Sequence, residues 1–500
     1  MNRIETALVS VSETEGLPEF ISALAGLGID IIATGGTARF LRERGIEVRE
    51  ISEVTGRVEL LGGLVKTIHP AIHSGILADR SNPGHMMEIE EQGYEKIDMV
   101  VVNFYSLSGL SDVRDLAFMD IGGPAMARAA AKNLFSCVPV IDPAYYGRVL
   151  EDIARDGTVG EALRWEMAGE AIARTSYYDS CILRLLQASG HVGTLPRHLT
   201  FGGERVLELR YGENPHQEAA YYSGLVDEFE VLKGELSYNN ILDIDCCLAQ
   251  LMEFGGNAAV VVKHVGPCGV ARSAGRAEAL RAAFECDPLS AFGGVIGVNY
   301  EFDGDCADYL AKKFVECIVA PSFSEDAVAR LSRKKRTRLV AMAGRRNAGP
   351  VMRTCLGGML AQTPDHVLFA GDLDFVAGRA GGSLAESLKF AWAVVKHVKS
   401  NSIVLARGSR TIGIGAGQPS RIDSAKVAIR KAKEHGHETA GSVMASDGFF
   451  PFPDCIELAH ENGVVAVVQP GGSIRDREVI ARAEELGLVM ALTSMRHFRH

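Results

Sequence analysis

The sequence has no long apolar run, no closely paired cysteines and no excess of positive charge, and each absence excludes a class of protein. No apolar stretch approaches the ~18 residues of a membrane span, and the N-terminus MNRIETALVSVS lacks the hydrophobic core of a signal peptide. The ten cysteines include no C-x-x-C pair, which argues against a disulfide framework or a zinc site and favours a reducing cytoplasm. A net charge of −11 argues against nucleic-acid binding, because that function needs a basic face.

The composition is that of a globular α/β protein. The chain of 500 residues is long enough for roughly two to four domains. With 47% hydrophobic and 23% charged residues, it has enough apolar material for several cores. Many of its 54 glycines stand in short turns between strand-like and helix-like segments, which is the alternation expected of an α/β fold.

The motif VVVKHVGPCGV predicts a strand that ends in two chemically useful side chains. The apolar run 258–262 predicts a buried strand, which is followed by Lys263 and His264 and then by a glycine-rich turn over 266–269. Open α/β sheets bind ligands at such strand ends. His264 could act as a base near neutral pH, and Lys263 could stabilise a developing oxyanion. The alternative is a solvated strand end with a chance histidine.

A glycine-rich turn near the N-terminus predicts an anion site. The strand-like residues 30–33 lead into the motif T-G-G-T at 34–37, and a helix follows from residue 38. Free backbone N–H groups and the positive end of the helix dipole converge at such a turn. The motif is not a Walker loop, so an ordinary βα turn is the alternative. Residues 413–418, GIGAGQ, lack the third glycine of a dinucleotide fingerprint.

Three more segments of the N-terminal part contain candidate site residues. Residues 64–75, LVKTIHPAIHSG, are predicted as a loop, in which Pro70 breaks the helix that two histidines four apart would need to bind a metal. Residues 99–104 are predicted as an apolar strand. Asp120 precedes the Gly-Gly-Pro start of a helix over 125–133, so a structural cap is the alternative to a catalytic role.

A break in periodicity predicts the domain organisation. Residues 188–200, ASGHVGTLPRHLT, lose periodicity and gather Gly, Pro and His. We therefore predict a first domain over 1–187, a linker over 188–200 and a second domain over 201–500. A second half of the latter domain begins near residue 350.

The ordered set of motifs resembles one family, the bifunctional purine-synthesis enzymes that join phosphoribosylaminoimidazolecarboxamide (AICAR) formyltransferase to IMP cyclohydrolase. The resemblance covers nearly the whole chain. The motifs that carry it are, in order, ALVSVS, ATGGTA, VKTIHP, VVNFY, DIGGPAMARAAAKN, RYGENPHQ, ELSYNN, KHVGPCGV, DPLSAFGG, VKSN, GIGAGQPSRIDS, FFPFPD, QPGGSIRD and RHFRH.

The resemblance implies a fold, an assembly and a location. A methylglyoxal-synthase-like domain over 1–187 would carry the cyclohydrolase, and two cytidine-deaminase-like subdomains over 201–500, without the deaminase zinc, would carry the transformylase. The family works as a homodimer with transformylase sites at the subunit interface, and we expect it in the cytoplasm. Its small-molecule partners are the nucleotides and 10-formyltetrahydrofolate as cosubstrate; no metal, nucleic acid or membrane is implied.

The resemblance also assigns the transformylase residues. His264 would take the proton of the weakly nucleophilic 5-amino group of AICAR, Lys263 would stabilise charge or orient the carboxamide, and Asn401 would be their polar partner. For Phe450 and Phe452 we expect core packing. The residues implied for the nucleotide are Arg210, Tyr211, Gly293, Glu316, Arg421, Phe449, Arg496 and His500, and those implied for the folate are Phe292, Ile422, Asp454 and Ser473.

The implied cyclohydrolase closes the formylated product into the purine ring and releases water. An Asp and a Lys twelve residues apart across a Gly-Gly turn could share proton transfer and oxyanion stabilisation. The implied catalytic residues are Lys66, Tyr105, Asp120 and Lys132. The residues implied to hold the phosphate and ribose are Ser10, Ser12, Thr34, Gly35, Gly36, Thr37, Thr67, Asn103 and Gly122.

Several positions of the first domain depart from the family pattern. Thr14 and Leu64 replace a Lys and an Arg that the family places near the phosphate. Leu134 and Ser106 replace a His and a Pro. The departures predict weaker or altered phosphate binding, unless another base substitutes for the lost cations. The candidates for this substitution are Arg39 and Arg128.

One departure lies in the transformylase motif, where Val265 and Gly266 replace the usual Thr and Asn. Glycine gives the turn freedom but removes an amide side chain, so another group would have to orient His264. Three functions stay open. We favour the full bifunctional enzyme; the alternatives are a transformylase with a degenerate first domain, and a non-catalytic nucleotide-binding protein.

Overall fold

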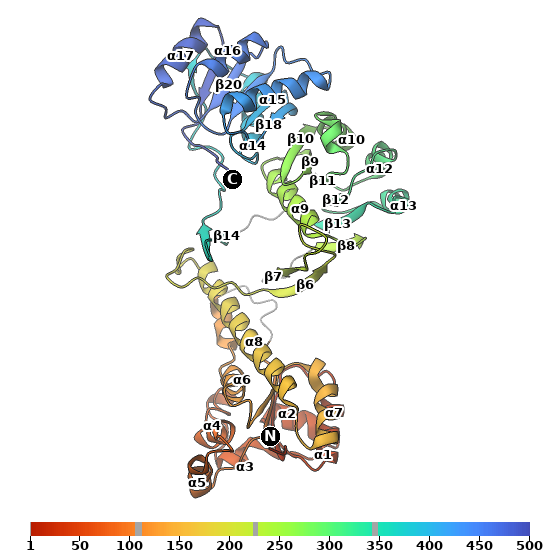
Figure 1. Ribbon diagram of the computed structural model, residues 1–500, viewed down its shortest axis with the longest axis vertical. Helices are drawn as coiled ribbons and strands as arrows, with labels where there is room; N and C mark the ends of the chain where they lie inside the picture. Colours follow the sequence, from red (N-terminus) through yellow and green to blue (C-terminus); the bar gives the residue numbers. More distant parts are fainter. Residues whose placement is uncertain (1, 106–112, 224–228, 343–348) are drawn as a thin grey trace. The chain divides into compact units, whose positions relative to one another are not determined.

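The protein, seen in a computed structural model, divides into two compact units (Figure 1). The first unit is Met1–Glu204 with Ser223–Val226, and the second is Arg205–Tyr222 with Asp227–His500. The structure describes residues 2–105, 113–223, 229–342 and 349–500. Within these ranges no helix has both the length and the apolar character needed to cross a membrane.

The first unit is built on a parallel five-stranded sheet in the order β3-β2-β1-β4-β5. Its strands are β1 (Thr6–Ser10), β2 (Asp30–Ala33), β3 (Arg49–Glu50), β4 (Met99–Val102) and β5 (Val138–Val140). In the central strand β1, Ala7 and Val9 pack into one core and Leu8 packs into the other. Both faces are thus shielded from water, which explains the continuous apolar run of β4.

Helices cover both faces of this sheet. Side chains of α1 and α7 join the core on one face, and side chains of α4 and α6 join the core on the other. The helices are α1 (Leu17–Gly26), α2 (Gly35–Arg42), α3 (Ile51–Thr55), α4 (Pro70–Leu77), α5 (Pro83–Glu91), α6 (Gly122–Lys132), α7 (Tyr146–Asp156) and α8 (Glu161–Ala188). Short 3-10 turns are η1 (Leu61–Gly63), η2 (Val113–Phe118) and η3 (Pro143–Tyr145).

The second unit is built on one mixed sheet of twelve strands, in the order β16-β21-β20-β19-β17-β18-β10-β9-β11-β12-β13-β8. The strands of its first half are β8 (Phe229–Lys233), β9 (Asn257–Lys263), β10 (Gly266–Ser273), β11 (Val295–Val298), β12 (Cys317–Ala320) and β13 (Arg338–Met342). Those of its second half are β16 (Asp374–Ala377), β17 (Ile403–Arg407), β18 (Arg410–Gly415), β19 (Val443–Ser446), β20 (Ala466–Gln469) and β21 (Val489–Leu492). Two small sheets pair β6 (Glu204–Leu209) with β7 (Ala219–Ser223) and β14 (Val351–Cys355) with β15 (Gly358–Gln362).

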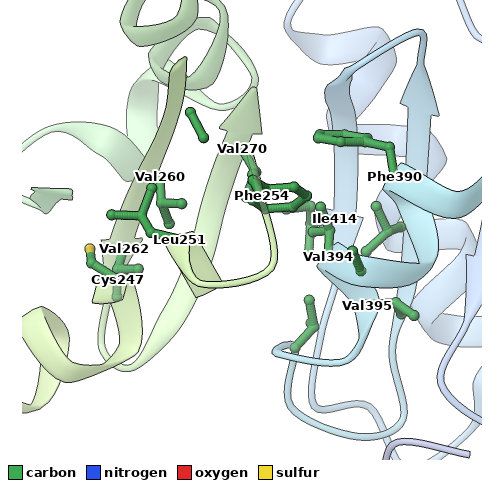
Figure 2. Close-up of a cluster of buried hydrophobic side chains, with 14 of the residues drawn as sticks. Cys247, Leu251, Phe254, Val260, Val262, Val270, Phe390, Val394, Val395 and Ile414 are labelled. Carbon is green, nitrogen blue, oxygen red and sulfur yellow. The ribbon is translucent and has the colours of Figure 1, made fainter. Parts of the chain in front are cut away.

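The two halves of the second unit meet in the middle of the twelve-stranded sheet. Strands β10 and β18 are antiparallel neighbours, with Ala271 opposite Arg410. One hydrophobic core draws on both halves, and Figure 2 shows Phe254 of the first half close to the side chains of the second. The rings of Phe254 and Phe390 lie 5.4 Å apart. The helices are α9 (Tyr238–Leu251), α10 (Arg276–Glu285), α11 (Pro288–Ala291), α12 (Gly304–Leu310), α13 (Glu325–Ser332), α14 (Ser383–Val395), α15 (Arg421–Glu434), α16 (Asp454–Glu461) and α17 (Asp476–Glu485).

The loop predicted over 64–75 is wrong in its second half, because residues 70–75 belong to α4. Pro70 is the first residue of that helix, where its missing N–H would have no helical partner in any case. His69 caps the helix, since its Nδ1 accepts the N–H of Ala71 at 3.2 Å. Among the described residues, no group of three or more His, Cys, Asp or Glu could hold a metal ion.

Two other expectations need correction. The turn predicted over 266–269 belongs to strand β10, so the turn itself is shorter. Phe452 is 48% exposed, beneath the guanidinium of Arg475, rather than part of the core. Phe450 is fully buried, as expected.

Candidate active sites

The Lys263-His264 motif lies at the head of a two-residue hairpin. Strand β9 ends at Lys263, which pairs with Gly266, the first residue of the antiparallel β10. The two residues between them, His264 and Val265, have positive φ angles of 55° and 60°. A type I′ turn requires two left-handed residues, and a β-branched residue such as Val adopts this conformation at a cost. The hairpin thus places His264 at its tip.

Two side chains of helix α9 form hydrogen bonds with this turn. A carboxylate oxygen of Asp243, a residue only 9% exposed, accepts the N–H of Val265 at 2.6 Å. The thiol of Cys246, one helical turn further on, donates to the carbonyl of Val265 at 3.4 Å. Burial raises the pKa of Asp243, and the N–H groups of Val265 and His264 oppose this rise because they bind the charged form.

Asn401 and Arg421 form a buried polar cluster with Asp447. Arg421 donates to Asn401 Oδ1 at 2.9 Å and to Ser446 Oγ at 2.8 Å, and it pairs with the carboxylate of Asp447, which is fully buried. The Nδ2 of Asn401 donates to the carbonyl of Gln418 at 3.1 Å. Arg421 therefore orients Asn401, and in the free chain its guanidinium is bound to Asn401, Ser446 and Asp447.

The C-terminal residues pack beside this cluster. Gly448 leaves room for them, since a Cβ there would lie 2.6 Å from Arg421 Nη2 and 2.7 Å from the ring of Phe498. The guanidinium of Arg496 lies 4.6 Å from the centre of that ring, and the ring of His500 lies 6.0 Å from it. Two predicted nucleotide residues, Arg496 and His500, are thus gathered around the ring of Phe498, which lies at Gly448 together with Arg421.

Arg499 connects the Asn401 segment to the hairpin turn. Its carbonyl accepts the N–H of Ser400, the neighbour of Asn401, at 2.8 Å. Its guanidinium donates to the sulfur of Cys246 at 3.8 Å. Because the same thiol contacts the turn that carries His264, the end of the chain joins the two halves of the predicted transformylase site.

The other predicted residues of the second unit are more scattered. The Lys263 ammonium donates to the carbonyl of Phe292 at 2.9 Å, so Phe292 lies beside the hairpin. Arg210 Nη2 donates to the hydroxyl of Tyr211 at 2.8 Å. Gly293 follows Phe292 directly in the chain. Within the part of the chain that the structure describes, no hydrogen bond or ring contact joins these two pairs to Glu316, Ile422, Phe449, Asp454 or Ser473.

In the first unit, polar side chains meet where β1, β2 and β4 end. Asn103, which follows β4, accepts the N–H of Ser12 at 2.6 Å and the Ser12 hydroxyl at 3.0 Å. The hydroxyl of Thr34 donates to Ser10 at 3.2 Å and lies 3.4 Å from the hydroxyl of Thr37. Parallel strands end at the same edge of a sheet, which brings these five predicted residues together.

An acidic side chain lies at the glycine turn that begins α2. The N–H of Gly35 donates to the carboxylate of Glu59 at 3.3 Å, and this carboxylate lies 3.6 Å from Lys66 Nζ. Arg39 lines the same 450 Å³ cavity as Gly35 and Glu59. A negative charge suits the N-terminus of a helix, so Glu59 lies where the sequence predicts the nucleotide phosphate.

Asp120, Gly122 and Thr67 meet at the N-terminus of α6. The carboxylate of Asp120 accepts the N–H of Gly123 at 2.9 Å, which fits the cap considered from the sequence. A Cβ on Gly122 would lie 2.3 Å from Thr67 Oγ1, so the close approach depends on glycine. Burial raises the pKa of Asp120, and backbone N–H groups, including that of the half-exposed Tyr105, oppose this rise.

Lys132 lies at the opposite end of α6 from Asp120. The helix has 11 residues, which corresponds to about 15 Å between its ends. Its C-terminal end is fixed by Asn133, whose amide donates to the carbonyl of Ile76 near the end of α4 at 2.8 Å. Lys132 and Arg128 line a separate 940 Å³ cavity. Within one chain, Asp120 and Lys132 are therefore too far apart to share a proton.

Comparisons with known proteins identify the family. The AICARFT/IMPCHase bienzyme model matches residues 130–431, and the MGS-like domain model matches residues 16–121. The bifunctional purine biosynthesis protein PurH of Persephonella marina is 45% identical over 512 residues, covering 99% of each chain. The protein of the same name from Bacillus subtilis is 43% identical over 515 residues, covering 99% of this chain and 100% of its own. The chain belongs to the AICARFT/IMPCHase bienzyme family.

A solved structure is also similar in sequence. The crystal structure of ForH is 35% identical and covers 37% of this chain and 98% of that chain, with a TM-score of 0.35.

Membership in the AICARFT/IMPCHase family confirms the predicted α/β fold class, with an MGS-like domain at the N-terminus. It also confirms that the chain is a bifunctional enzyme of purine biosynthesis with formyltransferase and cyclohydrolase activities.

Sequence reasoning missed four residues that organise the two sites of this AICARFT/IMPCHase enzyme. Arg499 lies inside the recognised motif RHFRH and Asp447 lies two residues before FFPFPD, so closer attention to the charged residues in and beside those motifs could have found them. Asp243 is an acid within the apolar pattern of NNILDIDCC, which is also a usable signal. Glu59 has no such signal, because its role depends on how its loop folds back to Gly35.

The departures of the first unit from the family pattern have different structural settings. Leu64 is 73% exposed and puts no charge at the position where the family has an Arg. Leu134 is buried in the core. Thr14 lies half-buried before α1, and Ser106 lies outside the described residues. Of the two candidate substitute cations, Arg39 lines the cavity at the glycine turn, whereas Arg128 lies beside Lys132.

Proposed function

We propose that the second unit transfers the formyl group of 10-formyltetrahydrofolate to the 5-amino group of AICAR, and that the first unit closes formyl-AICAR to IMP. The proposed boundaries are 1–187 for the cyclohydrolase, 188–200 for the linker and 201–500 for the transformylase, with its subdomain boundary near 350. Two facts support the linker: α8 ends at Ala188, and the next strand begins at Glu204.

In formyl transfer, His264 acts as the base. The 5-amino group is conjugated with the ring and the carboxamide, so it is a weak nucleophile that needs deprotonation as it attacks. A bond forms between this nitrogen and the formyl carbon, and the bond from that carbon to the folate nitrogen breaks. The amine proton passes to His264 and then to the folate nitrogen. Lys263 stabilises the oxyanion that develops on the formyl oxygen.

One observation supports this assignment above the others. His264 lies at the tip of a turn held by a buried carboxylate, and Asn401 is oriented by Arg421 in a cluster that the chain terminus joins to the same turn. Such preorganisation keeps reacting groups in place without reorganisation during the reaction. Arg496, His500 and Phe449 then contact the nucleotide.

The transformylase sites are completed in a homodimer. The residues expected to bind AICAR and the folate include several that one chain does not bring into contact, Arg210 and Tyr211 among them. A second copy can supply the missing side of each site. The folate residues Phe292, Ile422, Asp454 and Ser473 belong to this proposal, as do Gly293 and Glu316, a cytoplasmic location and chemistry that needs no metal.

In ring closure, the carboxamide nitrogen attacks the formyl carbon, and the former formyl oxygen leaves as water. Lys66 stabilises the oxyanion formed by this attack. Asp120, whose pKa is raised by burial, carries a proton from the attacking nitrogen to the leaving oxygen. The second proton of the water comes from the formamido nitrogen, which forms a double bond to the former formyl carbon as the C–O bond breaks. The nucleotide phosphate displaces Glu59 from Gly35, and Tyr105 faces the substrate. Lys132 of the same chain takes no part in these steps.

The product made from AICAR and 10-formyltetrahydrofolate tests the proposal. IMP shows that both activities are present, and IMP formed from added formyl-AICAR isolates the second step. Accumulation of formyl-AICAR would support a transformylase with an inactive first unit, a candidate motivated by Thr14 and Leu64. Binding of AICAR without turnover would support a non-catalytic nucleotide-binding protein.

A further inference from the structure

The turn that carries His264 depends on a residue outside the recognised motif. Its two left-handed residues are neither glycine nor asparagine, although these are the residues that favour type I′ turns. Val265 is β-branched, and a positive φ is rare and unfavourable for such a residue. Gly266, which the sequence suggests as the flexible position, does not have a positive φ. The strain therefore falls on His264 and Val265.

Asp243 is placed to offset that strain. Its carboxylate accepts the N–H of Val265 at 2.6 Å and also binds the N–H of His264. Hydrogen bonds that involve a charged acceptor are stronger than neutral ones, particularly where water is excluded. Asp243 projects from the middle of α9, whose neighbouring residues Ile244 and Cys247 are buried in the core. The carboxylate is therefore a rigid support for the turn.

We propose that Asp243 is a positioning residue of the transformylase, which holds the left-handed His264-Val265 turn and so fixes the imidazole against the amine of AICAR. The inference rests on the proposed role of His264 as the base. The family's asparagine is absent at position 266, and Asp243 takes its place as the group that orients His264. Asp243 itself does not touch the substrate.

The first test is the substitution Asp243→Asn in the full-length enzyme. It keeps the size of the side chain but removes the charge and one of the two acceptor oxygens. We expect the transformylase kcat to fall by about ten- to a hundredfold, because small misplacements of a reacting group have effects of this size. The KM for AICAR should change by less than about threefold, since the nucleotide contacts lie elsewhere.

Two controls separate positioning from general damage. Asp245→Asn makes the same chemical change two residues along α9, where the carboxylate faces Arg499 and His397 and has no hydrogen bond to the turn, so any loss of turnover that it causes should not be relieved by Val265→Gly. The cyclohydrolase activity of the same preparation, measured with formyl-AICAR, should also stay unchanged, because it belongs to the first unit. A preparation that keeps its AICAR KM contains a folded second unit.

The second test is a rescue by a change in the turn itself. Val265→Gly removes the β-branched side chain from a left-handed position that glycine adopts freely. If Asp243 acts by holding this turn, Val265→Gly should restore most of the activity lost in Asp243→Asn, to within about fivefold of the Val265→Gly enzyme. A purely structural role of Asp243 in the core would give no such recovery.

The outcomes distinguish failure of this inference from failure of the proposed function. Wild-type turnover in Asp243→Asn, or an equal loss with and without Val265→Gly, would overturn the positioning role while His264→Ala stays inactive. Wild-type turnover in His264→Ala would instead overturn the assignment of the base.

Discussion

The two sites of this chain differ in how firmly their charged residues are held. In the second unit, Arg421 is 8% exposed and its partner Asp447 is fully buried. In the first unit, the side chains of Lys66 and Glu59 are 26% and 33% exposed, and their charged atoms are 3.6 Å apart. Electrostatic interactions are stronger where water is excluded than at the surface. Substitutions should therefore have larger effects in the transformylase site than around the glycine turn of the cyclohydrolase.

The largest expected effect is that of His264→Ala on formyl transfer. We expect kcat to fall by about a hundredfold or more, the scale of positioned acid–base catalysis, while the KM for AICAR stays within about threefold. Steady-state assays with AICAR and 10-formyltetrahydrofolate measure both. Cyclohydrolase turnover of formyl-AICAR by the same variant is the control and should not change. Loss of both activities would show that the two sites are not independent.

The buried charges of the second unit also predict an acid-sensitive stability. Burial by itself would raise the pKa of Glu253, but His397 at 3.2 Å and Lys396 at 2.9 Å outweigh it and lower the pKa from 4.5 to about 2. A depressed carboxyl pKa adds stability above the unfolded value of 4.5, and this stability is lost as the pH falls towards 2. The loss corresponds to about 3 kcal/mol. Burial lowers the pKa of His397, which adds to the acid sensitivity.

Denaturant unfolding of the second unit between pH 6 and pH 2, followed by a probe confined to that unit, measures this loss. Glu253→Gln is the matched variant. It should be less stable at neutral pH, because it leaves Lys396 buried without a charged partner, but its stability should change less between about pH 4.5 and 2. Parallel pH curves for the two proteins would contradict the assignment to Glu253.

A smaller effect is expected at the chain terminus. Removing residues 498–500 deletes the carbonyl that binds Ser400 and the guanidinium that contacts His397 and Cys246. The loss of these three hydrogen bonds, together with the nucleotide contact proposed for His500, should raise the KM for AICAR by about tenfold. His497, which is buried against Asp365, stays in place, so thermal unfolding should change little. An unchanged KM would mean that the tail does not shape the nucleotide site.

The parts of this fold that could be predicted are those set by local pattern. The apolar run of β4 and the strand that ends at Lys263 follow from residue periodicity alone. The conformation of the hairpin does not, because it depends on the register between β9 and β10. Pairing of Lys263 with Gly266 moves the left-handed positions onto His264 and Val265 and leaves Gly266 in the ladder.

The same limit applies to the sites. The meeting of Ser12 with Asn103 follows from the parallel order of the strands, which the motif positions suggest. The separation of Asp120 and Lys132 follows from α6, because the two residues lie at opposite ends of this helix. The contact between Glu59 and Gly35 depends on a loop that no local pattern predicts.

The smallest expected effect is that of Glu59→Gln. This variant tests whether the Glu59 carboxylate competes with the nucleotide phosphate for the glycine turn. In the free enzyme the Glu59 carboxylate binds the N–H of Gly35 and lies near Lys66, so an incoming phosphate has to displace it. Glutamine removes the competing charge and frees Lys66. Because exposed ion pairs contribute up to about 1 kcal/mol, we expect the cyclohydrolase KM for formyl-AICAR to fall about two- to fivefold.

Glu43→Gln is the control for this prediction. Glu43 lines the same cavity but has no hydrogen bond to Gly35 and no ion pair with Lys66. It therefore makes the same change in net charge without freeing the glycine turn, and its KM should stay close to that of the unaltered enzyme. An equal fall in KM in both variants would assign the effect to the net negative charge of the cavity rather than to the contact between Glu59 and Gly35. A rise in KM for Glu59→Gln alone would show that Glu59 orients Lys66 for catalysis rather than competing with the phosphate.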